Sequence, residues 1–191
     1  MPTDLKVRPA TADRLPDLAD LFDTNGTTRG CWCMFFLVTG KAFSAGWGRV
    51  NRAGFEEFAA DVDPPAGLLA YRGDEPVGWC ATGPRGRYPR ALRSTVLKGR
   101  DRADDADIWL VPCFFVRRDA RRSGVTRALL DYAVGMAAEY GARAVEGFPL
   151  AGTDRHPSGE AFLGTEPVFA DCGFTVVSRP TPRRVIMRRE L

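Results

Sequence analysis

The sequence predicts a mixed α/β domain with about seven β-strands and about four helices. Ile108 to Val116 is almost continuously apolar, as expected for a central strand that is covered on both faces. A strong helical pattern follows, with apolar residues at helical spacing from Val125 to Tyr140. Shorter strand and helix patterns, separated by turn residues, flank this unit on both sides.

The chain length and composition narrow the class of protein. The 191 residues suit one domain, which we expect to span residues 1–191. The net charge of +3 is too small to indicate a nucleic-acid partner by itself. The longest apolar stretch, Cys31 to Val38, is too short to cross a bilayer, and the N-terminus has no apolar signal core. Five cysteines, mostly in apolar runs, argue against a disulfide framework. We therefore expect a cytoplasmic protein with no membrane partner.

The N-terminal part is expected to contain a strand over Leu5–Arg8 and a helix over Asp13–Phe22. Asp13 suits the N-cap of that helix, and Pro16 falls in its first turn, where a missing N–H group has no cost. The aromatic-rich segment Cys31–Trp47 gives no prediction of secondary structure. A helix over Arg52–Val62 follows and is ended by two prolines.

A hairpin is predicted next, with strands over Gly67–Arg72 and Glu75–Thr82 joined by a Gly-Asp turn. Gly83–Asp107 is expected to be a long loop rich in arginine. Beyond the central strand and its helix, four more elements complete the domain. They are a strand over Arg143–Phe148, a helix over Thr165–Cys172, and strands over Phe174–Ser178 and Arg184–Arg188.

The turn between the central strand and the following helix is the most informative segment. In FFVRRDARRSGVTRALL, the strand ends at Val116 and a basic turn leads directly into the helix. The first N–H groups of a helix lack partners and carry the positive end of its dipole, so such a place binds phosphate. Gly124 lets the backbone approach a bulky anion. A solvated basic turn without a ligand is the alternative.

This segment resembles the signature of the GNAT acyltransferase superfamily, R-x-x-G-x-G/A. The matching residues are Arg121-Arg122-Ser123-Gly124-Val125-Thr126, before a Leu-Leu pair, and the order of elements agrees over nearly the whole chain. The resemblance implies a mixed, mostly antiparallel sheet and acetyl-CoA as co-substrate, with no metal. It also implies that the cofactor is held by the end of the central strand and by the turn. The residues concerned are Phe114, Phe115, Val116, Arg121, Arg122, Ser123, Gly124, Val125 and Thr126.

Three positions depart from the family pattern. Arg122 stands where glycine is common, and Thr126 stands where glycine or alanine is usual. Thr126 adds bulk near the phosphates, but its hydroxyl can also donate to them. Phe169 occupies the position at which family members often carry a tyrosine as general acid, and phenylalanine cannot donate a proton.

Glu146 is the best candidate for a catalytic base, because an acid in an otherwise apolar strand is either functional or exposed on one face. That strand should flank the acyl group. Cys113 is expected to be an inert core thiol rather than a nucleophile, and the Cys31–Cys33 pair lacks the ligand set of a zinc site. Weaker catalytic candidates are Glu166, Asp171, His156, Tyr132 and Tyr140.

These features predict an N-acetyltransferase that moves an acetyl group from acetyl-CoA to a primary amine by direct attack in a ternary complex. The alternative is a non-catalytic acyl-CoA-binding or regulatory domain. The acceptor can be a small-molecule amine or a protein amine, and a homodimer is left open. Gly30–Phe36 would line an acceptor pocket that favours an apolar or aromatic body, or it is a packing cluster. The arginines of loop 83–102 either hold an anionic group of a substrate or are solvated.

Overall fold

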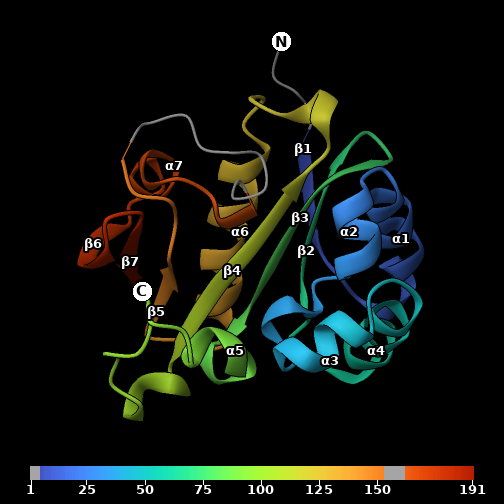
Figure 1. The fold of residues 1–191 in the computed structure, drawn as a ribbon. Helices are drawn as coiled ribbons and strands as arrows, with labels where there is room; N and C mark the ends of the chain where they lie inside the picture. Colours follow the sequence, from blue (N-terminus) through green and yellow to red (C-terminus); the bar gives the residue numbers. More distant parts are fainter. Residues whose placement is uncertain (1–4, 153–161) are drawn as a thin grey trace.

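The structure is a computed structural model that describes residues 5–152 and 162–191. Its centre is a seven-stranded sheet in the order β1-β2-β3-β4-β5-β7-β6 (Figure 1). The strands are β1 (Leu5–Pro9), β2 (Gly67–Arg72), β3 (Glu75–Pro84), β4 (Ile108–Val116), β5 (Ala144–Gly147), β6 (Thr175–Thr181) and β7 (Arg184–Glu190). The α-helices of the described residues are α1 (Leu15–Asp23), α2 (Gly26–Cys31), α3 (Gly40–Ala45), α4 (Arg49–Asp61), α5 (Pro89–Leu92), α6 (Val125–Glu139) and α7 (Glu166–Asp171).

All neighbouring strands are antiparallel except β4 and β5, which run parallel. This confirms the predicted mixed, mostly antiparallel sheet. Three helices are substantial, namely α1, α4 and α6, and the others have six residues or fewer.

The sheet is covered on both faces, which explains the continuous apolar character of β4. Helix α6 packs on one face, where Leu129 and Ala133 join the core beneath β2, β3 and β4. Helices α1, α2 and α4 gather on the other face around Phe22, Phe55 and Trp79. Figure 1 places α1–α4 together beside β2 and β3, and α7, β6 and β7 at the opposite end of the sheet.

The strands β4 and β5 separate part of the way along the sheet. Their pairing stops at Val111 and Gly147, where β5 ends, while β4 continues to Val116. At this point β4 also carries a bulge in its pairing with β3. Leu110 pairs with Gly83 and Cys113 pairs with Ala81, so β4 has one more residue than β3 between the two pairs. Pro112 lies in this bulge and has no N–H group to pair. Beyond Val111, β4 pairs with β3 alone, and the sheet is open on the β5 side.

Several predicted boundaries hold closely, and others are wrong. Strands β2 and β4 have the predicted limits, and α6 begins immediately after Gly124. Asp13 is not the cap of α1: it lies in a 3₁₀ turn, and its carboxylate accepts a hydrogen bond from Thr11. The arginine-rich segment 83–107 is not one long loop, since β3 extends into it and α5 and two 3₁₀ turns follow.

The segment Cys31–Trp47, which gave no prediction, contains the end of α2, a 3₁₀ turn and α3. Helix α2 ends because Trp32 and Cys33 adopt left-handed conformations, with φ of 47° and 55°. Residues other than glycine rarely adopt this backbone conformation, and glycine usually occupies it at a helix end. Because Trp32 and Cys33 stand here instead, the sequence does not show that a helix ends. No helix in the described part of the chain is long and apolar enough to cross a membrane.

Candidate active site

The turn between β4 and α6 forms a hollow of about 330 Å³. The described residues that line it are Val116, Ala120, Arg121, Arg122, Gly124, Val125, Thr126, Arg127 and Val168. Most of the residues predicted to bind the cofactor are among them. Ser123 lies at the side, where its hydroxyl donates to the Ala120 carbonyl at 2.7 Å.

The start of α6 presents free N–H groups to this hollow. The N–H of Ala128 donates to the Gly124 carbonyl at 3.0 Å, which is the first hydrogen bond of the helix. The N–H groups of Val125, Thr126 and Arg127 come before it and have no carbonyl partner within the helix. Gly124 has φ of 84°, and a Cβ placed on it would meet no atom within 4 Å. The open space above Gly124 and the unpaired N–H groups fit a phosphate.

Arg122 shows why glycine is common at its position. It has φ of 61°, a left-handed conformation that costs a side-chain-bearing residue about 1–2 kcal/mol. The turn therefore keeps its shape with arginine in place, and the guanidinium group adds positive charge beside the hollow.

The edge of β4 that lies beyond the end of β5 is the second part of the site. The N–H of Arg117 donates to the Val77 carbonyl on the β3 side at 2.9 Å. Because alternate residues of a ladder point to the same neighbour, Phe115 also faces β3, whereas the backbone groups of Phe114 and Val116 face away from it. These groups lie where β5 has already ended, so they offer a free strand edge to an extended ligand.

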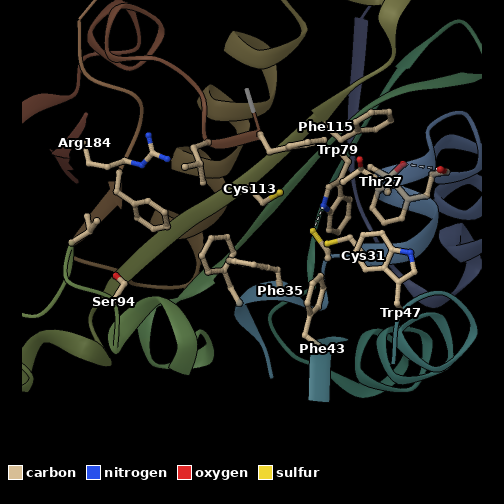
Figure 2. A pocket seen from close by; sticks show the side chains of 18 residues that line it. Thr27, Cys31, Phe35, Phe43, Trp47, Trp79, Ser94, Cys113, Phe115 and Arg184 are labelled. Atoms are coloured by element: carbon tan, nitrogen blue, oxygen red, sulfur yellow. Dashed lines mark hydrogen bonds between the residues drawn. The ribbon is translucent and has the colours of Figure 1, made fainter. Parts of the chain in front are cut away.

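A larger cavity of about 520 Å³ lies where β4 and β5 separate (Figure 2). Cys113 and Phe115 of β4 line it, as does Phe148, which follows β5. The other described lining residues are Phe22, Thr27, Thr28, Cys31, Cys33, Phe35, Phe36, Phe43, Trp47, Trp79, Ser94, Val96, Phe162, Leu163 and Arg184. Figure 2 shows Ser94 and Arg184 on one side of β4, and Cys31, Phe43 and Trp47 on the other. The segment after α1 thus contributes to a cavity wall.

The thiols of Cys31 and Cys113 in this cavity are protonated at neutral pH, because their surroundings raise the pKa of each. A hydrogen bond with Cys33, together with burial, raises the pKa of Cys113 well above its usual value. Burial and the neighbouring Cys33 raise the pKa of Cys31 to about 12. The indole Nε1 of Trp79 donates to Cys33 Sγ at 2.9 Å. A thiolate nucleophile has no support here, because the environment disfavours the charged form. No group of three or more potential metal ligands occurs among the described residues.

Glu146 lies next to the opening but its carboxylate faces two arginines. Oε2 accepts a hydrogen bond from Arg85 Nη1 at 2.7 Å, and Oε1 accepts two from Arg188, at 3.0 and 2.7 Å. Arg85 is fully buried and also donates to the Asp105 carboxylate and to the Asp101 carbonyl, both at 2.7 Å. Glu146 itself is 2% exposed and is not among the described residues that line the cavity.

These ion pairs bear on the predicted role of Glu146. Both carboxylate oxygens accept hydrogen bonds from arginines, and Glu146 is not among the described residues that line the cavity in which an amine would bind. The arrangement instead ties β5 to β7 and to the turn after β3, next to the point where the sheet opens. The role of Glu146 as a base stays a prediction, and its contacts do not support it.

Comparison with known proteins decides the family. The sequence model of the acetyltransferase (GNAT) family matches residues 32–152. The chain belongs to the GNAT acetyltransferase family. It is therefore an acetyl-CoA-dependent acetyltransferase, and the residues of the turn and the β4 edge fit that substrate.

Solved structures share the fold of this acetyltransferase. A GCN5-related N-acetyltransferase from Kribbella flavida is 18% identical with a TM-score of 0.59, over 100% of both chains. The GNAT domain of S. lividans PAT is 19% identical with a TM-score of 0.57, over 98% of this chain and 90% of that one. The putative acetyltransferase yncA from Salmonella typhimurium, solved with acetyl-CoA, is 12% identical with a TM-score of 0.57, over 98% and 94%. A search of curated proteins gives no match.

Phe169 of the acetyltransferase is fully buried beside the opening of the sheet. Its ring packs edge-on against Phe114 and Phe174, with centroids 6.1 and 5.0 Å away. The ring also lies over Gly147, where a Cβ would overlap it. Phe169 therefore closes the α7 side of the opening with an apolar ring and offers no proton.

The weaker catalytic candidates lie elsewhere or serve the fold. Glu166 accepts a hydrogen bond from the N–H of Gly152 at 2.8 Å, and Asp171 pairs with Arg127 at 2.6 Å on the surface. Tyr132 and Tyr140 do not lie within an apolar face as expected, because they are 38% and 48% exposed. His156 lies outside the described residues.

The basic segment 83–102 is neither a solvated loop throughout nor a simple anion site. Arg85 is buried against Glu146, and Arg87 donates to three backbone carbonyls before and within β3, at 2.7 to 3.2 Å. Arg90 stacks on Phe35 with its guanidinium carbon 3.7 Å from the ring centroid. Only Arg93 of the four predicted arginines is exposed. Sequence reasoning missed these contacts because their partners are distant in the chain.

Proposed function

We propose that this acetyltransferase transfers the acetyl group of acetyl-CoA to a primary amine by direct attack in a ternary complex. The observation that carries the proposal is the arrangement of two hollows on one strand. Cys113 and Phe115 of β4 line the aromatic cavity, and Val116 lines the phosphate hollow. Both substrates can therefore bind at once, with the β4 edge between them, so a covalent acetyl-enzyme is not needed.

In this proposal the turn and the strand edge bind the coenzyme. The N–H groups at the start of α6 and the hydroxyl of Thr126 hold the pyrophosphate, and Arg121 and Arg122 neutralise its charge. The backbone of Phe114 and Val116 pairs with the pantetheine arm as an added strand would. Bound in this way, the coenzyme presents its thioester at the cavity, next to Cys113.

The chemistry is then aminolysis of a thioester. The amine lone pair forms a bond to the carbonyl carbon, the carbon–sulfur bond breaks, and the proton lost by nitrogen ends on sulfur or in water. A backbone N–H of β4 on the side that faces away from β3 polarises the carbonyl. Phe169 cannot supply the proton to the thiolate, so solvent does. Glu146 is the predicted acceptor of the amine proton, and its ion pairs with Arg85 and Arg188 favour instead a role in holding β5.

Initial-rate kinetics test the ternary complex. Release of free CoA is followed while acetyl-CoA and an accepted amine are varied together. Intersecting double-reciprocal lines support direct attack, whereas parallel lines indicate an acetyl-enzyme and overturn it. Binding of acetyl-CoA without CoA release for any amine or protein amine would favour the non-catalytic alternative.

A further inference from the structure

We infer that the acetyl acceptor is a weakly basic aromatic amine, of the arylamine class, which enters the cavity uncharged. This inference rests on the proposed amine acetylation and names its substrate class. It is carried by the volume and aromatic lining of the cavity, by the sign of the charges around it and by the polar groups that line it.

The cavity is lined mainly by apolar aromatic rings. Nine of its described lining residues are aromatic, and its volume of about 520 Å³ is that of a small-molecule site. The rings hold one another in edge-to-face pairs: Phe35 with Phe43 at 5.3 Å, and Phe43 with Trp47 at 5.6 Å between centroids. Such rings favour an aromatic guest, which can make the same edge-to-face contacts.

The charges around the cavity disfavour an ammonium ion. No described lining residue is a carboxylate, and the one charged side chain among them is that of Arg184, a cation. Aromatic walls can bind a cation by themselves. Here, however, the guanidinium of Arg90 lies 3.7 Å from the centroid of Phe35 and 5.6 Å from that of Phe43. A buried alkylammonium would face this positive charge with no carboxylate among the described lining residues to balance it, which is costly.

The described lining residues also include no carboxylate and no histidine, the usual general bases. They contribute hydroxyls, an arginine and the thiols of Cys31, Cys33 and Cys113. Glu146 is outside the lining and is held by Arg85 and Arg188. An acceptor that arrives with its lone pair free needs no such base. An aniline nitrogen satisfies this, because its lone pair is delocalised into the ring and it is not protonated at neutral pH.

The proposed step balances without a base in the cavity. The neutral aniline nitrogen forms the bond to the acetyl carbon while the carbon–sulfur bond breaks. The nitrogen is then strongly acidic and gives its proton to the departing thiolate, directly or through water. The products are an anilide and CoA thiol, and no other reactant is required.

Matched pairs of amines test the inference. Anilines and benzylamines that carry the same para substituent are compared at neutral pH with saturating acetyl-CoA, and kcat/KM is measured from CoA release. We expect the anilines to be preferred by at least about tenfold, which corresponds to 1.4 kcal/mol. Equal or higher values for the benzylamines, or for butane-1,4-diamine, would overturn the substrate class while leaving amine acetylation intact. No turnover of any amine by protein that binds acetyl-CoA would overturn both.

The contribution of Arg90 is tested by Arg90→Met, with Arg93→Met as control. Arg90 Nη1 is buried without a hydrogen-bond partner in the described structure, so the substitution breaks no hydrogen bond of that nitrogen, whereas Arg93 is exposed nearby. Without the guanidinium, the benzylamines should gain relative to the anilines, and the preference should shrink several-fold. An unchanged preference in a variant with wild-type melting temperature would remove Arg90 from the argument, and a shrinkage of equal size in Arg93→Met would do the same.

Discussion

Replacing Glu146 with glutamine removes the negative charge that faces Arg85 and Arg188. The arginine that matters for stability is Arg85, because its side chain is 0% exposed while that of Arg188 is 25% exposed. Breaking a buried ion pair by removing one partner costs about 3–5 kcal/mol. Asp105 still contacts Arg85, so we expect a loss near the lower end of that range, about 3 kcal/mol.

This loss converts to a measurable fall in melting temperature. For a chain of 150–250 residues, about 1 kcal/mol shifts the melting temperature by about 2–4 °C, so Glu146→Gln should melt about 6–12 °C below the wild type. Thermal unfolding followed by circular dichroism measures the shift. Glu190→Gln is the matched control: Glu190 approaches Arg188 at 3.7 Å but is 69% exposed, and its removal should change little.

Turnover of the same variant separates the two roles of Glu146. If its main role is to hold β5 to the turn after β3, the folded variant should keep turnover within several-fold of the wild type at a temperature well below its melting point. If it is the general base, turnover should fall by about 10²–10⁴-fold and recover partly at high pH. A variant with wild-type melting temperature and such a fall would refute the structural reasoning.

Three further variants test the site and the fold around it. Gly124→Val should abolish CoA binding measured by calorimetry, because a side chain at φ of 84° is strained and projects into the space above the turn; the helix variant Gly135→Ala should keep it. Gly147→Ala should lower the free energy of unfolding by about 1–3 kcal/mol, since the added Cβ overlaps Phe169, and a wild-type urea midpoint would contradict this. Arg87→Met should lower the melting temperature, because three carbonyls lose their donor, yet leave both Michaelis constants unchanged; a raised constant for acetyl-CoA would revive a role for Arg87 in cofactor binding.

The parts of the fold that sequence patterns predicted are those governed by local physics. Strand β4 has its predicted bounds because its residues are apolar on both faces and lie between two covering layers. The start of α6 directly after Gly124 followed from the helical spacing of the apolar residues, and phosphate binding at this turn stays a prediction. Helix α2 was missed because its end depends on Trp32 and Cys33 in a conformation that their side chains disfavour.

The environment of Glu146 could not be predicted for a different reason. An acid in an apolar strand indicates that some special partner exists, but not which one. Its partners are Arg85, 61 residues earlier, and Arg188, 42 residues later, and only the folded sheet brings them together. The same holds for Arg90, whose aromatic partners are Phe35 and Phe43. Strands β2 and β3 separate these partners from Arg90 along the chain.

The missing tyrosine and the aromatic cavity have one chemical explanation in common. Phe169 supplies no acid, and the described lining residues include no carboxylate or histidine, so the proposed mechanism leaves proton transfer to the substrates and solvent. An arylamine tolerates this, because its nitrogen attacks uncharged and becomes acidic enough to protonate the thiolate. An alkylamine must first lose a proton in water, so its rate should rise about tenfold per pH unit below its own pKa. We therefore expect kcat/KM for a benzylamine to climb steeply between about pH 6 and 9, while that for the matched aniline stays nearly flat. Parallel profiles for the two amines would show that a titrating group of the protein controls the step, and would refute this account.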